Sequence, residues 1–329
     1  MDTLAPELLM LVFSLVRPGD LPAVAAVCRH WAEVLLGNSP RTLDLSEGGR
    51  TFEVDDRYVH FVARKLDVTW LKLGDCAALS EASVGALLQH ARSLRHLELS
   101  HATINSLMAR QLRTRLDGTR ALDTLVIPHC LLWTSMQGWP QAERLRHLDI
   151  QRCAFGAPLE DMWDWPSFTA LESLAASALT PRVLSHLACL RRLRKLSLVH
   201  CDIRVNDETL ETFRRIETLE LDGCSIYSNF PVRPIWAALA DVLRVAQNLQ
   251  TLKLHSIGPA VISDEYLAKW VEQCPHLESL EVVCSEMGRA SNVGPKTFRA
   301  LADTCGPVLR RLSLFQCDAS GMLAAVPSL

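Results

Sequence analysis

A nine-residue pattern recurs eleven times along this 329-residue chain, and it constrains the fold more than any other feature of the sequence. Its clearest copy is residues 193–201, with the form L-x-x-L-x-L-x-x-C. In a β-strand Leu196 and Leu198 point to one face, and the residues beside them point to the other. The fourth position is Leu in every copy. The other ten copies begin at Pro40, Val68, Leu94, Leu122, Leu145, Leu171, Ile216, Leu249, Leu277 and Leu309.

The spacing of these copies predicts how they assemble. Successive copies begin 22 to 33 residues apart, and self-similarity at such a period indicates a solenoid of stacked repeats. The pattern resembles the leucine-rich repeat. That resemblance implies an α/β fold in which the strands form a curved parallel sheet on the concave face, with helices and loops on the convex face. We expect about eleven repeats over residues 40–317.

The cysteines agree with a stacked, reduced protein. More than half of the eleven occupy the ninth position of a copy, where a small side chain fits a buried turn and its thiol can bond a backbone carbonyl. The chain has no C-x-x-C pair of the kind that binds zinc. We therefore expect an intracellular protein, cytoplasmic, nuclear or both. The ninth-position cysteines are Cys76, Cys130, Cys153, Cys201, Cys224 and Cys317.

Charge and hydropathy argue against several other classes of protein. The net charge is −3, whereas binding to nucleic-acid phosphates needs a basic surface, so we expect no nucleic-acid partner. No stretch reaches the roughly 18 apolar residues of a membrane span, so we expect no membrane partner. The apolar start of the chain is a poor signal peptide, because it contains Glu7, follows Asp2 and lacks a basic leader.

The first 39 residues do not follow the repeat, and their apolar residues have helical spacing. Pro6 and Glu7 suit the first turn of one helix. Asp20 is a candidate N-cap of a second helix, and a third short helix contains Trp31 and ends at Gly37. Three helices of this length bury too little apolar area to be stable alone. We therefore expect a partner or the adjoining repeats to complete their core.

Residues 4–36 resemble the F-box, whose pattern is roughly L-P-x-E-L-L, an apolar pair, D-L and V-C-R-x-W. In this chain Ala5 stands where the family has Pro, and Pro6 follows one position later. In the family this three-helix module binds the adaptor Skp1 within a cullin-RING ubiquitin ligase, and the repeats that follow recruit the substrate. The resemblance places an F-box at residues 1–39. It implies Skp1 contacts from Leu4, Pro6, Leu8, Leu9, Val12, Phe13, Leu15, Leu21, Val24, Val27, Cys28 and Trp31.

Segments between the strands predict the convex side of the repeats. Residues 225–235 read as a loop in the longest repeat, and residues 318–329 as a short C-terminal tail or a partial cap of the array. Short amphipathic helices are expected at residues 55–62, 80–90, 207–214, 264–273 and 295–304. Their candidate N-caps are Ser80, Asn206 or Asp207, and Ser263 or Asp264.

Residues 128–170 depart from the helical pattern and contain Trp133, Trp139, Trp163 and Trp165. We expect extended or turn-rich backbone there. Two interpretations of the tryptophans stay open. They either fill space that a helix would occupy, since a Trp buries a large apolar area, or they are exposed and bind a partner. Trp163 is predicted to be buried, because it follows Pro158 on one helical face with two other apolar residues.

The sequence contains no phosphate-binding, dinucleotide-binding or serine-hydrolase motif, so we expect a non-catalytic protein without a cofactor. Cys130 beside His129 and Cys201 beside His200 are the nearest candidates for reactive thiols, but adjacent residues at a strand end point apart. His101 and His129 share the eighth position of neighbouring repeats and can approach each other. A metal site would need a third ligand, so we predict none.

The outward positions of the strands form a long row on the predicted concave face. At about 4.8 Å per strand the row is on the order of 48 Å long, which suits an extended protein or peptide better than a small molecule. Its side chains are polar and of mixed charge. The candidate substrate-binding residues are Trp70, Lys72, His96, Glu98, His101, His129, His147, Asp149, Lys195, Glu220, Lys253, Glu281 and Arg311.

Together these features favour a non-catalytic substrate-recognition subunit of an SCF-type (Skp1–cullin–F-box) ubiquitin ligase. Its partners would be Skp1, the cullin-RING core bound through Skp1, and a protein substrate that the sequence does not identify. The alternative is an interaction scaffold that binds Skp1 without delivering a substrate. The substrate could also bind the Trp-rich loops or the C-terminal end instead of the concave face.

Overall fold

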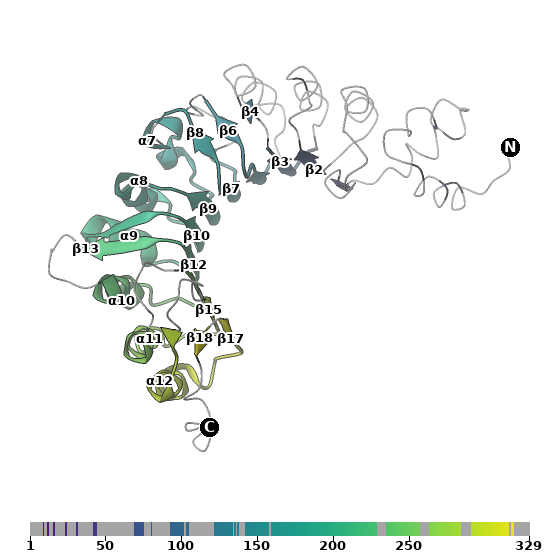
Figure 1. Cartoon of the computed structure of the whole chain (residues 1–329). Coiled ribbons are helices and arrows are strands. Elements are labelled where there is room, and N and C mark those ends of the chain that lie inside the picture. Colours follow the sequence, from purple (N-terminus) through teal and green to yellow (C-terminus); the bar gives the residue numbers. More distant parts are fainter. Residues whose placement is uncertain are drawn as a thin grey trace. The chain divides into compact units, whose positions relative to one another are not determined.

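The computed structural model describes the chain in segments that fall into two compact units, Met1–Asp164 and Trp165–Leu329 (Figure 1). The boundary lies inside the predicted repeat array. The residues that the structure describes are 9, 12, 16, 24, 31, 42–44, 69–75, 80, 93–101, 103–104, 122–133, 135, 137, 142–157, 159–228, 235–256, 263–283, 291–315 and 317–318.

In the first unit, parallel strands pair in the order β1-β2-β3-β5-β7. Each strand begins at the third position of a copy of the pattern, and these third positions pair with one another from Thr42↔Trp70 to Thr124↔His147. The predicted strands and their register are therefore confirmed here. The strands are Thr42–Asp44 (β1), Trp70–Asp75 (β2), His96–Ser100 (β3), Thr124–Val126 (β5) and His147–Ile150 (β7).

A second, smaller sheet of the first unit consists of Thr103–Ile104 (β4), Leu131–Leu132 (β6) and Ala154–Phe155 (β8). After β8 comes a single helical turn, Leu159–Met162 (α7). The expectation of extended backbone with little helix in this stretch is confirmed among the described residues. The small parallel sheet itself was not predicted.

The second unit continues the same construction. Its strands pair in the order β9-β10-β12-β14-β15-β17, all in parallel and all in the predicted register. Two smaller parallel sheets, β11-β13 and β16-β18, follow the strand ends. The main strands are Ser173–Ser177 (β9), Lys195–Val199 (β10), Thr218–Asp222 (β12), Thr251–His255 (β14), Ser279–Val283 (β15) and Arg311–Phe315 (β17). The smaller ones are Asp202–Val205 (β11), Ser225–Ser228 (β13), Ser291–Asn292 (β16) and Cys317–Asp318 (β18).

Helices cover one side of the sheet in the second unit (Figure 1). Three of them were predicted and are confirmed: Asp207–Phe213 (α9), Asp264–Val271 (α11) and Pro295–Cys305 (α12). Pro181–His186 (α8) and Ile235–Val245 (α10) were missed, as were the short 3-10 helices Trp165–Ser167 and Leu187–Cys189. The predicted loop at 225–235 was partly wrong, because β13 occupies its start and α10 begins at its end.

Side-chain chemistry at the helix starts explains why these helices form. The Thr180 hydroxyl accepts a hydrogen bond from Val183 N at 3.4 Å, and Pro181 follows in the first turn of α8. Asn206 and Thr209 form a reciprocal capping box at α9. Of the predicted caps, Asn206 and Ser263 are confirmed. The predicted helices at 55–62 and 80–90 lie outside the described residues, apart from Ser80.

The core of each unit lies on the inward face of its main strands. Leu71, Leu97 and Leu125 of the first unit and Leu219 and Leu280 of the second are all fully buried at the fourth position of the pattern. Burial of an apolar side chain of this size stabilises by roughly 1.5–3 kcal/mol relative to exposure. Within the described residues, no helix has the length and apolar character that crossing a bilayer requires.

The eighth position of the pattern has left-handed backbone in seven repeats, with φ between 50° and 60°. Only Gly223 is a glycine there, and the remaining six residues carry side chains at a torsion that is unfavourable for them. The same turn therefore recurs in each of these repeats. Its left-handed residue follows the main strand and directs the chain toward the smaller sheets and the helices, which we call the second layer. The other six are His101, His129, Arg152, Ala178, His200 and Ser256.

Candidate functional site

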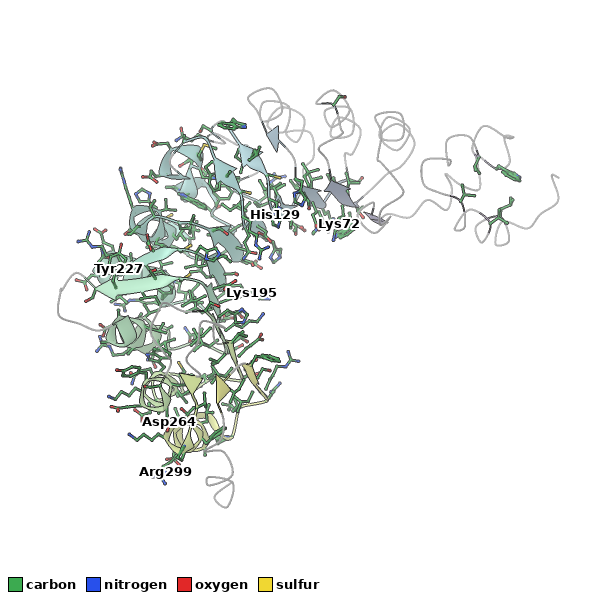
Figure 2. The ribbon with its side chains drawn as sticks, viewed as in Figure 1. Lys72, His129, Lys195, Tyr227, Asp264 and Arg299 are labelled. Atoms are coloured by element: carbon green, nitrogen blue, oxygen red, sulfur yellow. The ribbon has the colours of Figure 1, made fainter. Side chains whose placement is uncertain are left out.

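The third and fifth positions of each repeat form a continuous polar surface on the main sheet of each unit, which we call the strand face. Every candidate on it is half-buried or exposed. In the second unit, Figure 2 shows Lys195 on this side of the sheet and Tyr227, Asp264 and Arg299 on the helix side. The strand face is therefore available to a partner molecule in each unit.

On the strand face of the first unit, neighbouring strands pair through their side chains. The rings of Trp70 and His96 stack with centroids 4.8 Å apart and planes 16° from parallel. Lys72 Nζ lies 3.3 Å from Glu98 Oε1. Because the pairs join β2 to β3, they fix the positions of four side chains that were predicted as separate candidates.

Burial changes the titration of two groups on this face. Burial lowers the pKa of His96, although Glu98 and Asp123 oppose that shift. Burial also raises the pKa of Asp149, against a hydrogen bond that Gln151 N donates to its carboxylate at 2.9 Å. The lowered pKa of His96 favours a neutral imidazole, so near pH 7 this surface presents a stacked aromatic pair beside a lysine–glutamate pair.

Two predicted candidates lie beyond the strand ends. His101 and His129 occupy the left-handed eighth position and are exposed. Their rings stack at 4.9 Å with planes 15° apart, which confirms that they approach each other. Among the described residues no group of three His, Cys, Asp or Glu side chains could hold a metal ion. The pair is therefore an exposed aromatic stack at the lip of the sheet.

The strand face of the second unit carries charges of alternating sign. Lys253 Nζ lies 3.5 Å from Glu220 Oε2 on the neighbouring strand. His255 Nε2 lies 3.2 Å from Glu281 Oε1, but at an angle unsuited to a hydrogen bond. Lys195 and Arg311 are exposed at the strand starts. His255 was not among the predicted candidate residues. It occupies the seventh position of its repeat and lies on the same surface.

The ninth-position cysteines tie successive repeats together. Three of their thiols donate to the carbonyl at the sixth position of the preceding repeat: Cys130 to Leu99 at 3.3 Å, Cys153 to Ile127 at 2.9 Å and Cys224 to Leu198 at 3.3 Å. The Cys201 thiol instead accepts a hydrogen bond from Leu179 N of the preceding repeat at 3.3 Å. None of the cysteines whose side chains the structure describes forms a disulfide. Burial raises the pKa of Cys153 to about 12, so this thiol is a poor nucleophile. His129 and His200 point to solvent while Cys130 and Cys201 are buried, as predicted.

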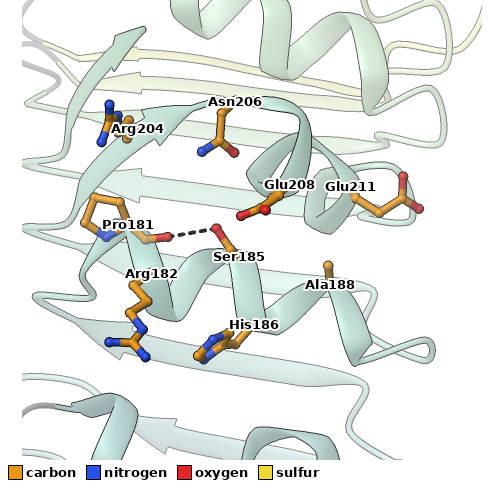
Figure 3. Close-up of a pocket in the computed structure, with 9 residues that line it drawn as sticks. All are labelled: Pro181, Arg182, Ser185, His186, Ala188, Arg204, Asn206, Glu208 and Glu211. Carbon is orange, nitrogen blue, oxygen red and sulfur yellow. Dashed lines mark hydrogen bonds between the residues drawn. The ribbon is translucent and has the colours of Figure 1, made fainter. Parts of the chain in front are cut away.

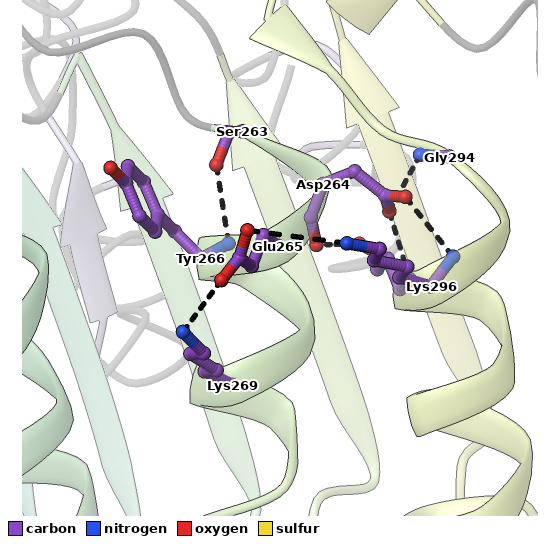
Figure 4. Close-up of polar contacts among 8 residues, drawn as sticks. Ser263, Asp264, Glu265, Tyr266, Lys269, Gly294 and Lys296 are labelled. Carbon is purple, nitrogen blue, oxygen red and sulfur yellow. Dashed lines mark hydrogen bonds and ion pairs between the residues drawn. The ribbon is translucent and has the colours of Figure 1, made fainter.

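A carboxylate on the helix side joins two helices (Figure 4). Asp264 lies in the first turn of α11, yet its oxygens accept hydrogen bonds from the backbone nitrogens that open α12: Gly294 at 2.9 Å, Lys296 at 3.1 Å and Thr297 at 2.8 Å. A Cβ at Gly294 would lie 2.8 Å from Asp264 Oδ2, so glycine permits this approach. Asp264 had been predicted only as a possible cap of its own helix.

An open groove of about 670 Å³ lies at α8 and α9 on the helix side of the second unit (Figure 3). Arg182, His186 and Arg204 contribute basic groups, and Glu208 and Glu211 contribute acidic ones. The Glu211 carboxylate already pairs with Arg214 at 2.6 Å. The groove therefore presents mixed charge without converging donors, and its lining does not select a ligand.

Few of the predicted Skp1-binding residues fall within the described part of the chain. Leu9, Val12, Val24 and Trp31 are helical. Leu9 is fully buried, Val12 is 42% exposed, and the other two are half-buried. Leu9 thus contributes to the interior of this segment, whereas Val12 is accessible to a partner. Those outside the described residues are Leu4, Pro6, Leu8, Phe13, Leu15, Leu21, Val27 and Cys28.

Comparison with known families decides how the N-terminal segment is classified. The family described as F-box-like matches residues 2–39. The chain joins an F-box-like region to leucine-rich repeats. The match includes all of residues 4–36, on which the sequence pattern of the F-box lies. A comparison with curated protein sequences gives no match.

Several solved structures align with this chain at low sequence identity. A chain of the Rad7 and Elc1 complex in yeast aligns with a TM-score of 0.54 at 15% identity, over 94% of this chain and 75% of that one. An internalin from Listeria monocytogenes gives 0.45 and 14%, over 80% and 70%. A chain of the TLR13–ssRNA13 complex gives 0.47 and 15%, over 80% of this chain but only 38% of that one. The chain thus spans well under half of the TLR13 chain.

Proposed function

We propose that this F-box-like protein is the non-catalytic substrate-recognition subunit of an SCF ubiquitin ligase. The observation that carries the proposal is the F-box-like match at residues 2–39, followed directly by leucine-rich repeats. The F-box-like region would bind Skp1, and through it the cullin-RING core in the cytoplasm or nucleus. The similar fold of a chain crystallised in the Rad7 and Elc1 complex agrees with a role in protein assembly.

The role of the repeats in this proposal is to position a protein substrate. Holding a substrate lysine near the charged ubiquitin-conjugating enzyme turns a bimolecular step into an effectively unimolecular one, so the rate gain needs no reactive group in this chain. The strand face supports this role because it is long, polar and accessible. We assign substrate contact to its predicted residues, including the exposed Lys195 and Arg311.

Co-purification with Skp1 tests the proposal at an accessible position. Val12→Asp places a charge on an exposed helical residue and should abolish co-purification, since an apolar docking surface does not accept an unpaired carboxylate. Val308→Asp is the matched control, because Val308 is 38% exposed and lies in the repeats. Leu9 is unsuitable for this test, because a charge at a buried position would unfold the segment.

The outcomes separate Skp1 binding from unfolding and from scaffolding. Both variants should keep the circular dichroism and melting temperature of the wild type, and Skp1 retained by Val12→Asp would contradict the assignment. Proximity labelling from the full chain, with and without proteasome inhibition, then tests delivery. Proteins that accumulate only under inhibition, and only when Val12 is intact, are substrates. Labelling unchanged by inhibition would favour the scaffold instead.

A further inference from the structure

We propose that the end of β6 is a docking site for a basic segment of a protein partner, with an arginine or lysine side chain lying against the indole of Trp133. The site lies on the second layer of the first unit, away from the strand face. The inference goes beyond the proposed function, and it holds whether or not the chain delivers substrates to a ligase.

Two large apolar side chains are exposed at the end of β6, Leu131 within the strand and Trp133 directly after it. Trp133 is 63% exposed and Leu131 is 41% exposed, while Leu132 between them is fully buried. The hydrogen bond from Gly156 N to Leu132 O continues the pairing of β6 and β8 past the two strands. Residues two apart on extended backbone point to the same face, so Leu131 and Trp133 share the outward face. Tryptophan is the residue most typical of binding hot spots, and here it is accompanied by a second exposed apolar side chain.

The neighbouring strand leaves one face of the indole open. The register Leu131↔Ala154 and Leu132↔Phe155 places Gly156 opposite Trp133. A Cβ at Gly156 would lie 2.9 Å from Trp133 Cε3, so only glycine allows the indole to lie against this backbone. Ala154, Gly156 and Ala157 are exposed and small. The indole therefore rests on β8 on one side and is accessible on the other.

Hydrogen bonds hold this segment in place from both sides. Ala154 N donates to Cys130 O at 2.9 Å, and Gly156 N donates to Leu132 O at 2.8 Å. Beyond Trp133, Ser135 Oγ and Gln137 Nε2 donate to Asp161 O at 3.1 and 3.0 Å. β6, β8 and α7 accordingly lie close together in Figure 1. A surface that is already ordered loses little conformational entropy on binding.

The charges next to the indole indicate which partner it would select. Residues 131–142 contain no charged side chain. The adjacent helix α7 has Glu160 and Asp161 in its single turn, and Asp164 follows it. Asp161 and Asp164 are exposed. A cation over an indole is attracted by the negative face of the ring, and nearby carboxylates strengthen that attraction. A basic segment with apolar neighbours complements both features, whereas an acidic segment would be repelled.

Fluorescence polarisation of two labelled hexapeptides with the full chain tests the proposal. Gly-Leu-Arg-Leu-Arg-Gly should bind the wild type, and Gly-Leu-Glu-Leu-Glu-Gly should not. Trp133→Ala should weaken binding of the arginine peptide about tenfold, as expected for loss of a hot-spot residue. Asp161→Lys should weaken it by a similar factor through repulsion, without touching the backbone carbonyl that Ser135 and Gln137 use.

The control is Tyr227→Ala, since Tyr227 is an aromatic residue 40% exposed on β13 of the second unit. It should leave the affinity unchanged. Equal affinity in Trp133→Ala, equal binding of the glutamate peptide, a matching loss in Tyr227→Ala, or no binding to the wild type up to about 1 mM would each overturn the proposal. Should Trp133→Ala prove unstable, Asp161→Lys decides the outcome by the same criterion.

Discussion

Two stretches with repeats of similar length cover their sheet in different ways. In the part of the chain that the structure describes, the repeats that begin at Leu122 and Leu145 contain β6, β8 and only the four-residue α7 before the first unit ends. The repeats that begin at Leu171 and Leu193 do not exceed these two in length, yet they contain α8 and the seven-residue α9. Repeat length therefore does not decide whether a helix forms.

Local chemistry accounts for the difference. In the helical stretch, Thr180 and Asn206 cap α8 and α9 by hydrogen bonds to their first-turn nitrogens. The other stretch contains Gly138, Pro140, Gly156 and Pro158, and both residue types disfavour helix interiors. Among the described residues of this stretch, bulky buried side chains pack behind the sheet, and Trp163 is one of them at 1% exposed.

Replacing Trp163 should have the largest effect and would break this comparison most directly. Trp163→Ala should lower the free energy of unfolding by about 3–5 kcal/mol, because it removes a large buried ring and leaves a cavity. The denaturation midpoint of the full chain, followed by circular dichroism, measures the loss. Trp163→Phe is the control and should cost clearly less. An unchanged midpoint in Trp163→Ala would show that the ring does not fill the missing helix's place.

Removing the cap that spans two helices should have a smaller effect. Asp264→Ala should cost about 1–2 kcal/mol at pH 7, since the nitrogens of Gly294, Lys296 and Thr297 lose their acceptor. Asn206→Ala is the matched control, because Asn206 caps α9 within its own repeat and is uncharged. It should cost about 1 kcal/mol. Unfolding of both variants by denaturant gives the two values.

The pH dependence distinguishes the two caps. Burial raises the pKa of Asp264, but the hydrogen bonds from Thr297, Lys296 and Gly294 outweigh it, so the folded-state pKa lies below its usual value. A carboxylate with a depressed pKa stabilises above its unfolded pKa of about 3.9, and this contribution is lost as the pH falls through the folded value. The cost of Asp264→Ala should therefore shrink below about pH 4, while that of Asn206→Ala should not change with the carboxylate. If the difference between the stability costs of Asp264→Ala and Asn206→Ala stayed constant across that pH range, a charged cap at Asp264 would be ruled out.

The sequence predicted the main strands correctly because their leucines occupy the same positions within each copy of the pattern, although the spacing between copies varies. Each described main strand begins at the third position, as expected. The second layer was harder to predict. The strands β6 and β8 are two residues long, too short for an alternating pattern. The helix α10 begins at Ile235, the last residue of the predicted loop, and no helix was predicted after that loop.

The site was predictable to a similar extent. Alternation along the strands identified the strand face, but the partners of each side chain depend on stacking between repeats. The pair Lys72–Glu98 and the ring stack of Trp70 on His96 join residues 26 apart in sequence. The left-handed eighth position was hidden because only Gly223 marks it, while histidine, arginine, alanine and serine occupy it elsewhere. The role of Asp264 requires α12 to lie beside α11.

The smallest expected change in stability is at Trp133, and it sharpens the comparison between the two tryptophans of the first unit. Trp133→Ala should alter the free energy of unfolding by no more than about 0.5 kcal/mol, as is usual for exposed positions. The indole is 63% exposed and rests on Gly156, so its removal uncovers backbone but opens no cavity. Denaturation of Trp133→Ala and Trp163→Ala under the same conditions gives the ratio of their losses in free energy of unfolding. A loss at Trp133 near that at Trp163 would mean that both rings replace a helix, and the exposed indole would then have no need of a partner to explain it.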